Sequence, residues 1–138
     1  MIHPLLLAAI PELGTAELAG PGSNPRIVGY TATAGGAAPD DVPWCSSFVN
    51  WCAKQAGLAM SGSKAARSWL HVGTPLLEPE QGCVCVFWRG DHDDKMHGHV
   101  AIFLYRVGPV LVCLGGNQGN IVGVNGYMVS HLLGMRRL

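Results

Sequence analysis

The spacing of apolar residues changes about half-way along the chain. In residues 45–56 apolar side chains recur at positions 45, 48, 49, 52 and 56, a period that predicts an amphipathic helix ending at Gly57. Shorter helices are predicted over residues 5–13, over residues 25–33 with Asn24 as the N-cap, and over residues 64–72 after a serine cluster. The first half of the chain is therefore expected to be helical.

Beyond Pro75 the pattern changes to short runs rich in β-branched and aromatic residues. These runs predict strands over residues 83–88, 99–107, 110–114, 121–124 and 133–137, with a hairpin turn at Gly108-Pro109. The strand that begins at His99 is apolar at consecutive positions, which indicates burial on both faces. Helices followed by strands predict an α+β fold in which N-terminal helices pack on a C-terminal antiparallel sheet.

Length and charge limit the possible functions. A chain of 138 residues with 49% hydrophobic residues predicts one globular domain over residues 1–138. Nine basic and nine acidic residues balance, which argues against nucleic acid or an anionic membrane as the partner, and we expect a monomer. The apolar residues 1–10 carry no Lys or Arg and are followed by Pro11, so neither a signal peptide nor a membrane span is expected.

A cysteine occupies the first turn of the central predicted helix. Cys45 follows Pro43-Trp44, where free backbone N–H groups and the helix dipole favour an anion, so it is the candidate nucleophile. The alternative is that Cys45 is a small buried apolar residue, the role expected of Cys52. The five cysteines are odd in number and lie in apolar segments, so we expect reduced thiols.

Two later segments offer partners for this thiol. His99 follows Gly98 at the start of an apolar strand, where its imidazole could deprotonate a neighbouring cysteine. A hairpin would return the glycine-rich turn after residue 114 to this point, so that Asn117 could hold the imidazole, with Gln118 as the reserve candidate. The alternative for this segment is an ordinary turn.

Other polar and aromatic residues have two interpretations each. Trp44, Trp69 and Trp88 are candidate cleft walls or ordinary core residues. Zinc ligands could be chosen among Cys83, Cys85, His92, His97 and His99, but their spacing is poor for a metal site. We expect His92, His97 and the aspartates at 91, 93 and 94 to be solvated loop residues, and we expect no metal and no cofactor.

Eight short motifs occur in order along nearly the whole chain. They are Glu12-Leu13-Gly14, Asn24-Pro25-Arg26-Ile27, Pro43-Trp44-Cys45, Phe48-Val49-Asn50-Trp51-Cys52, Ser68-Trp69, Val86-Phe87-Trp88-Arg89-Gly90, Gly98-His99-Val100 and Leu114-Gly115-Gly116-Asn117-Gln118. In their order and residues these motifs resemble papain-like peptidoglycan hydrolases of the CHAP (cysteine, histidine-dependent amidohydrolase/peptidase) and NlpC group, in a bacterial and phage branch.

The resemblance implies a papain-like fold and cysteine-dependent cleavage of an amide or peptide bond in the stem peptide or cross-link of peptidoglycan. It implies Cys45 as nucleophile, His99 as base and Asn117 as the residue that orients the base. Substrate contacts are then expected from Trp44, Trp69, Trp88 and Gln118. Two positions depart from the pattern: Gly115 stands where many CHAP domains have an acidic residue, and Cys83 stands where this branch often has aspartate.

The biological setting has more than one interpretation. A protein made in the bacterial cytoplasm without a signal peptide could reach the cell wall as a phage lysin released by a holin. It could equally be an antibacterial effector delivered by a secretion system, which would predict an immunity protein that plugs the cleft. The alternative from a different class is a non-catalytic domain that binds the cell wall or another protein.

Overall fold

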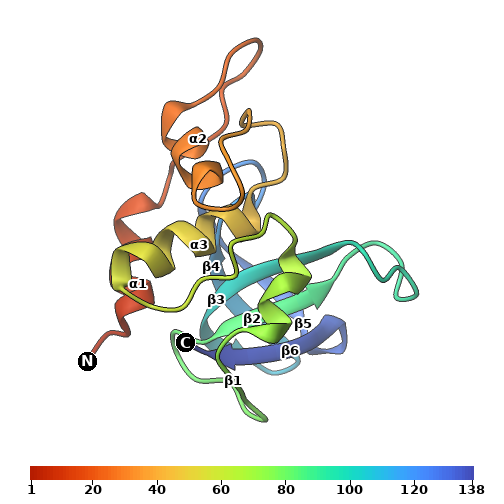
Figure 1. The fold of residues 1–138 in the computed structure, drawn as a ribbon. Coiled ribbons are helices and arrows are strands. Elements are labelled where there is room, and N and C mark those ends of the chain that lie inside the picture. Colours follow the sequence, from red (N-terminus) through yellow and green to blue (C-terminus); the bar gives the residue numbers. More distant parts are fainter.

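The computed structural model describes residues 1–138 and places helices against one face of a six-stranded antiparallel sheet (Figure 1). The sheet has the order β1-β6-β2-β3-β4-β5. The α+β prediction is therefore confirmed. The helical elements are α1 (Pro4–Ala9), η1 (Ile10–Glu12), α2 (Pro25–Ala32), α3 (Cys45–Ala56), η2 (Ala66–His71) and η3 (Val129–His131). The strands are β1 (Thr74–Pro75), β2 (Val84–Trp88), β3 (Gly98–Val107), β4 (Val110–Gly115), β5 (Gly123–Met128) and β6 (Leu132–Arg137).

The central helix agrees with its prediction, whereas two shorter helices differ. Helix α3 ends at Gly57, which adopts a left-handed conformation (φ 68°) that glycine reaches without strain. The predicted helix over residues 5–13 divides at Ile10 into α1 and the 3-10 helix η1, because Pro11 cannot donate to the α-helical ladder. The predicted helix over residues 64–72 is the shorter 3-10 helix η2, in which Ser68 Oγ bonds the carbonyl of Ala65 at 2.6 Å. None of the helices is long and apolar enough to cross a membrane.

The strand predictions hold except for the fourth, and the two-residue strand β1 was not predicted. The fourth strand was predicted over residues 121–124, but β5 begins at Gly123 and continues to Met128. Ile121 instead forms an isolated bridge to Ala16, and its carbonyl accepts a hydrogen bond from Gln118 N at 2.9 Å. The prediction was wrong because β5 is a largely exposed edge strand, which lacks the apolar alternation of an inner strand.

Alternation along the sheet divides the core into two clusters. Val84 and Val86 of β2 face the helices, whereas Cys85 and Phe87 face the other side of the sheet.

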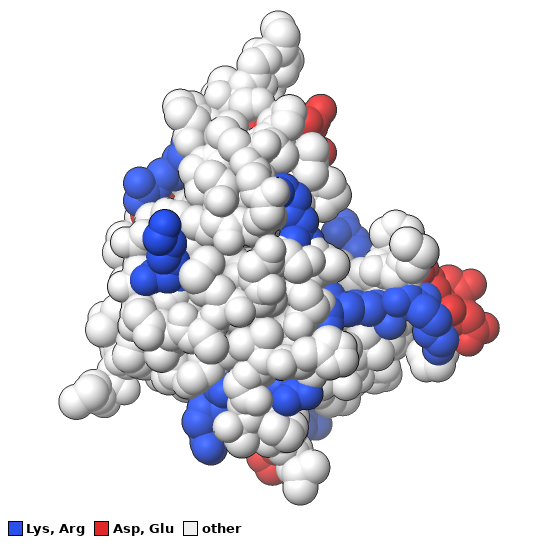
Figure 2. All heavy atoms as spheres, viewed as in Figure 1, with Lys and Arg blue, Asp and Glu red and all other residues white.

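All five cysteines are free and buried, and no three His, Cys, Asp or Glu side chains converge as metal ligands. Nothing in the arrangement therefore supports the zinc interpretation. On the outer surface shown in Figure 2, charged side chains are sparse, and acidic ones gather at the tip of the loop between β2 and β3.

Helix α3 is fixed against the sheet near the start of β3. Cys45 and Phe48 share the larger core cluster with Val100 of β3 and Leu114 of β4. The chain that leaves β4 also touches the first turn of α3, because a Cβ atom built on Gly116 would lie 2.6 Å from Phe48 Cβ. Only glycine permits this approach. The N-terminus of α3, the start of β3 and the turn after β4 therefore meet in one place.

A carboxylate fastens the N-terminal helices together. Glu12 is buried and accepts hydrogen bonds from Arg26 Nε at 2.6 Å, Arg26 Nη2 at 3.0 Å and Tyr30 Oη at 2.7 Å. The hydrogen bonds from Arg26 hold the pKa of Glu12 below its usual value, and they outweigh the opposing effect of burial. The ionised carboxylate is thus the form that stabilises the fold.

We expect Glu12→Gln to lower the free energy of unfolding by about 1–3 kcal/mol at pH 7, because it removes charge-assisted hydrogen bonds. A carboxyl with a lowered native pKa contributes stability above its unfolded pKa of about 4.3 and loses it as pH falls through the native pKa. The difference in free energy of unfolding between Glu12→Gln and wild type, measured by urea unfolding, should therefore become smaller below about pH 4. Glu78→Gln, at an exposed position, is the control. If Glu12→Gln lowered the free energy of unfolding by the same amount at pH 7 and at pH 3, this account would be contradicted.

Candidate active site

Two adjoining hollows open over the place where α3, β3 and the turn after β4 meet. The first has a volume of about 390 Å³ and the second about 530 Å³, and both are lined by Arg89, Gly90, Asn117 and Gly119. The shared residues make them two lobes of one groove. The first lobe is further lined by Phe87, Trp88, His99, Gln118, Asn125, Tyr127 and His131, and the second by Pro43, Asp94, His97, Gly98 and Asn120.

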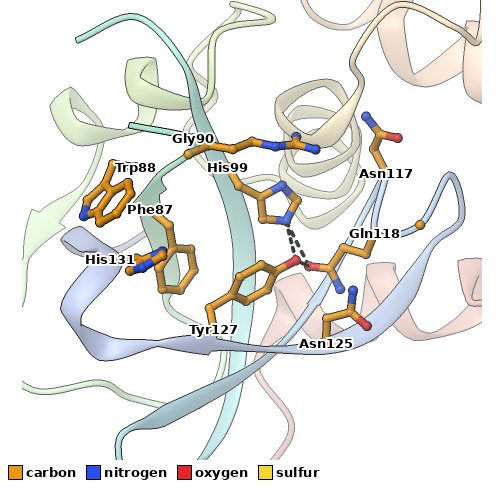
Figure 3. Close-up of a pocket in the computed structure, with 11 residues that line it drawn as sticks. Phe87, Trp88, Gly90, His99, Asn117, Gln118, Asn125, Tyr127 and His131 are labelled. Atoms are coloured by element: carbon orange, nitrogen blue, oxygen red, sulfur yellow. Dashed lines mark hydrogen bonds between the residues drawn. The ribbon is translucent and has the colours of Figure 1, made fainter. Parts of the chain in front are cut away.

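The imidazole of His99 is held on one side by two polar side chains. Its Nε2 lies 3.0 Å from Gln118 Oε1 and 3.0 Å from Tyr127 Oη, and Tyr127 Oη donates to Gln118 Oε1 at 2.8 Å (Figure 3). The Tyr127 ring stacks on the imidazole, with centroids 5.0 Å apart, and on Phe87 at 4.8 Å. These contacts fix both the position and the plane of the imidazole.

The same contacts determine which nitrogen of His99 carries the proton. Gln118 Nε2 donates to the carbonyls of Gly123 at 2.8 Å and Cys113 at 3.3 Å, so Oε1 is the atom that faces the imidazole. An oxygen acceptor at that position requires a proton on His99 Nε2. Nδ1 is then unprotonated and available as a base.

Cys45 is the first residue of α3 and lines neither lobe of the groove. Its exposed fraction is 4%, and burial is the main reason that the pKa of its thiol is raised. Backbone N–H groups of Val100, Ser46 and Cys45 itself act in the opposite direction, and so does the positive charge of Arg89. Since Val100 follows His99 directly, the sulfur lies beside the strand segment that carries the imidazole.

Both members of the pair are neutral at neutral pH. Burial lowers the pKa of His99 to about 4, assisted by the charge of Arg89 and opposed by the hydrogen bond to Gln118. The thiol pKa moves in the opposite direction, so neither group ionises alone near pH 7. The arrangement suits an imidazole that removes the thiol proton as the sulfur attacks, rather than a thiolate formed in advance.

The first turn of α3 also offers hydrogen-bond donors. No side chain caps this helix start, and its first turn contains no acidic residue. The backbone N–H groups of Cys45 and Ser46 act on the Cys45 thiol, where they would stabilise an oxyanion that forms on a substrate carbonyl.

The residue that contacts the imidazole is Gln118, whereas Asn117 was expected there. Asn117 makes no hydrogen bond to His99, and its side chain lies apart from the Gln118 contact (Figure 3). The backbone explains the difference, because Asn117 adopts φ 56° and the tight turn presents the following residue to the imidazole. Asn117 instead lines both lobes of the groove.

The absence of a side chain at position 115 makes this contact possible. A Cβ atom built on Gly115 would lie 2.7 Å from Gln118 Oε1 and 2.9 Å from Ala101 Cβ. An acidic side chain, common at this position in the family that the sequence resembles, would therefore occupy the space of the glutamine amide. Gly115 and Gln118 act as a matched pair.

The three expected tryptophans occupy different environments. Trp44 and Trp69 are fully buried core residues that line neither lobe, so they correct the expectation of cleft walls. Their indole N–H groups bond Glu17 Oε1 at 2.8 Å and Ser46 Oγ at 2.9 Å, which satisfies them inside the core. Trp88 does line the first lobe, where it stacks on His131 with centroids 3.9 Å apart.

The loop histidines are placed away from the imidazole of His99. His92 is exposed, and His97 pairs with Asp94 at 2.5 Å on the rim of the second lobe. Tyr127 and Arg89 are the site residues that sequence reasoning did not identify. Arg89 belongs to a motif that was quoted without a role, and Tyr127 lies on the strand whose position was predicted wrongly.

Comparison with known proteins identifies the family. The model of the CHAP domain family matches residues 37–117, more than half of the chain, so the chain belongs to the CHAP domain family. This is a family of peptidoglycan hydrolases, generally cysteine peptidases or amidases, that act at the cell wall.

A solved structure shares the fold. It is a protein similar to lipoprotein, of the NLP/P60 family, from Staphylococcus aureus subsp. aureus Mu50, with 18% sequence identity and a TM-score of 0.55. The match covers 97% of this chain but only 40% of that one. No curated protein gave a significant match.

Substitutions at 117 and 118 should separate orientation of the base from substrate contact. We expect Gln118→Ala to lower kcat by about 10- to 100-fold with little change in KM, because the imidazole loses the acceptor that fixes its tautomer. Asn117→Ala, which changes only the lining of the groove, should act mainly on KM. Steady-state kinetics on soluble muropeptides would measure both effects. If Asn117→Ala lowered kcat and Gln118→Ala changed mainly KM, Asn117 and not Gln118 would be the residue that orients the base.

Proposed function

We propose that this protein is a cysteine-dependent peptidoglycan hydrolase that cleaves an amide or peptide bond of the stem peptide or cross-link. The observations that carry the proposal are the contacts of His99 Nε2 with Gln118 Oε1 and Tyr127 Oη, which leave Nδ1 as the base, and the contact of the Cys45 thiol with the backbone N–H of Val100, the residue after His99. A buried imidazole held in this way serves as a base for a neighbouring thiol. The proposal thus assigns Cys45 as nucleophile, His99 as base and Gln118 as the orienting residue.

The reaction follows from the protonation states of the pair. As Cys45 Sγ attacks the carbonyl carbon, Nδ1 of His99 takes the thiol proton, and the negative charge on the carbonyl oxygen is stabilised by N–H groups at the start of α3. His99 then gives this proton to the leaving amine, so that the C–N bond breaks and a thioester remains. A water molecule, deprotonated by His99, hydrolyses the thioester and restores the thiol.

Gln118 and Tyr127 stabilise the imidazolium that forms in each half of the reaction. The Nε2 proton remains on His99 throughout, donated to Gln118 Oε1 and Tyr127 Oη. Burial raises the pKa of Tyr127, so its hydroxyl keeps its proton and its hydrogen bond to Gln118. The two residues are positioning residues, since they act through His99.

The shape and polarity of the groove are compatible with a peptide substrate. Amide-bearing and glycine residues from the turn at 117–120 line one side, and they offer hydrogen bonds without charge. The stacked rings of Trp88 and His131 provide an apolar surface at the first lobe, suited to packing against a sugar ring or an aliphatic stem residue. Peptidoglycan offers both kinds of group.

Delivery and partners extend this proposal. The domain would act alone as a monomer on the wall, either as a phage lysin released by a holin or as an effector delivered by a secretion system. In the second case an immunity protein would occupy the two-lobed groove. A non-catalytic wall-binding domain is the competing function, but such a domain would have no need for an imidazole with a fixed tautomer beside a thiol.

Loss of one sulfur should separate catalysis from binding. We expect Cys45→Ala to abolish release of fragments from purified sacculi while the variant still binds them, because Cys45 is the only thiol in the first turn of α3. Cys52→Ala removes a buried thiol from the same helix, and this control should retain activity. Turbidity loss and mass spectrometry of the fragments measure the outcome, and undiminished lysis by Cys45→Ala would refute the proposal.

The pH profile should reflect the buried imidazole. Because the pKa of His99 is lowered to about 4, the base form persists into acid, and kcat/KM should remain near its maximum at pH 5.5 with its acid limb close to pH 4. The raised pKa of Cys45 should keep the neutral thiol present further into alkaline pH than for an exposed cysteine. An acid limb at pH 6.5 or above would show that His99 is not desolvated as described.

A further inference from the structure

One arginine lacks a partner within the protein. Five of the six arginines donate hydrogen bonds to protein acceptors: Arg26, Arg67, Arg106, Arg136 and Arg137. Arg89 alone makes no hydrogen bond and no ion pair to the chain. A guanidinium has five N–H donors and keeps its charge at every pH of interest, so it is suited to an acceptor from outside.

Arg89 occupies the junction of the groove. It follows β2 directly and lines both lobes, as Asn117 does. Its positive charge lowers the pKa of Cys45 and that of His99, so the guanidinium lies within electrostatic range of the reacting groups. A substrate that spans the two lobes would pass this side chain.

No acidic residue of the groove competes for this charge. The first lobe contains no Asp or Glu, and the second contains only Asp94. The carboxylate of Asp94 is already engaged by His97 Nδ1 at 2.5 Å and by the backbone N–H of Met96 at 2.8 Å. The groove therefore presents one unpaired positive charge, which favours an anionic group on the ligand.

We propose that Arg89 binds a free carboxylate of the substrate next to the scissile amide, so that the enzyme prefers acidic stem peptides to their amidated forms. This inference rests on the proposed function and narrows its substrate class. A carboxylate matches the planar guanidinium with two parallel hydrogen bonds, whereas a carboxamide offers only one acceptor and no charge. Arg89 would then be a specificity-determining residue that holds the peptide across the junction.

Matched substrates test the preference. Soluble muropeptides from sacculi are compared before and after their stem carboxylates are converted to amides with carbodiimide and ammonium chloride. We expect wild type to favour the free-carboxylate form by about 10- to 100-fold in kcat/KM, mainly through KM, as for the loss of a charge-assisted pair. Arg89→Gln should lose this preference for the free-carboxylate form, and Arg89→Lys should keep part of it. Arg106→Gln, on the β3–β4 hairpin, should keep the full preference.

Alkylation of Cys45 tests the same charge without any peptidoglycan. Iodoacetate and iodoacetamide form the same S–C bond with loss of iodide, but only iodoacetate carries a carboxylate. We expect Arg89→Gln to lower the iodoacetate-to-iodoacetamide rate ratio at Cys45 by about tenfold, because the anion loses its partner. Expressing the result as a ratio cancels any change in access to the buried thiol.

The outcomes separate the two proposals. If Cys45→Ala abolishes lysis but Arg89→Gln leaves both ratios unchanged, the hydrolase assignment stands and the carboxylate site is wrong. If no variant or wild type cleaves muropeptides but the alkylation ratio falls in Arg89→Gln, the anion site stands and the peptidoglycan assignment fails. A greater loss of kcat than of KM in Arg89→Gln, equal for both muropeptide forms, would show that Arg89 acts on the thiol and not on the substrate.

Discussion

The site depends on the hydrogen bonds that hold Nε2 of His99. Gln118 and Tyr127 approach the same nitrogen at 3.0 Å, and two backbone carbonyls fix the glutamine amide from behind. A neutral imidazole in water exchanges freely between tautomers, but one that faces a fixed acceptor keeps its proton on that side. The opposite nitrogen is thereby reserved for the thiol. Burial has a cost, since it disfavours both ionised forms, yet it also strengthens every dipole that acts when charge develops during reaction.

Glycines let the backbone segments that carry these groups approach one another closely. Gly115 leaves room for the amide of Gln118, and Gly116 lets the turn after β4 touch the first turn of α3. Gly98 plays a similar part on the other side, because a Cβ atom there would lie 2.9 Å from the carbonyl of Phe87. Gly98 and Gly116 let separate elements of the fold approach each other, and Gly115 makes room within its own turn. The catalytic geometry therefore depends on backbone approach as much as on the polar residues themselves.

The sequence predicted most of the fold but only part of the site. Residues 45–56 carry a helical period and residues 99–107 a continuous apolar run, so the central helix and the strand with His99 were placed correctly, with Cys45 at the helix start. The turn after β4 gives no such signal: whether Asn117 or Gln118 reaches the imidazole depends on a positive φ that tertiary packing selects. Tyr127 was missed because an exposed edge strand has no apolar rhythm, and Trp44 and Trp69 were misplaced because composition does not distinguish a cleft wall from a core.

The tautomer of His99 in solution is the most direct test of the account. Long-range ¹H–¹⁵N spectra of the ¹⁵N-labelled protein distinguish a protonated from an unprotonated ring nitrogen, and the His99→Gln variant assigns the signal. We expect a neutral imidazole with the proton on Nε2 at pH 7, which stays neutral until the pH approaches the lowered pKa of about 4. A ring protonated on both nitrogens at pH 7, or one that carries its proton on Nδ1, would contradict the account.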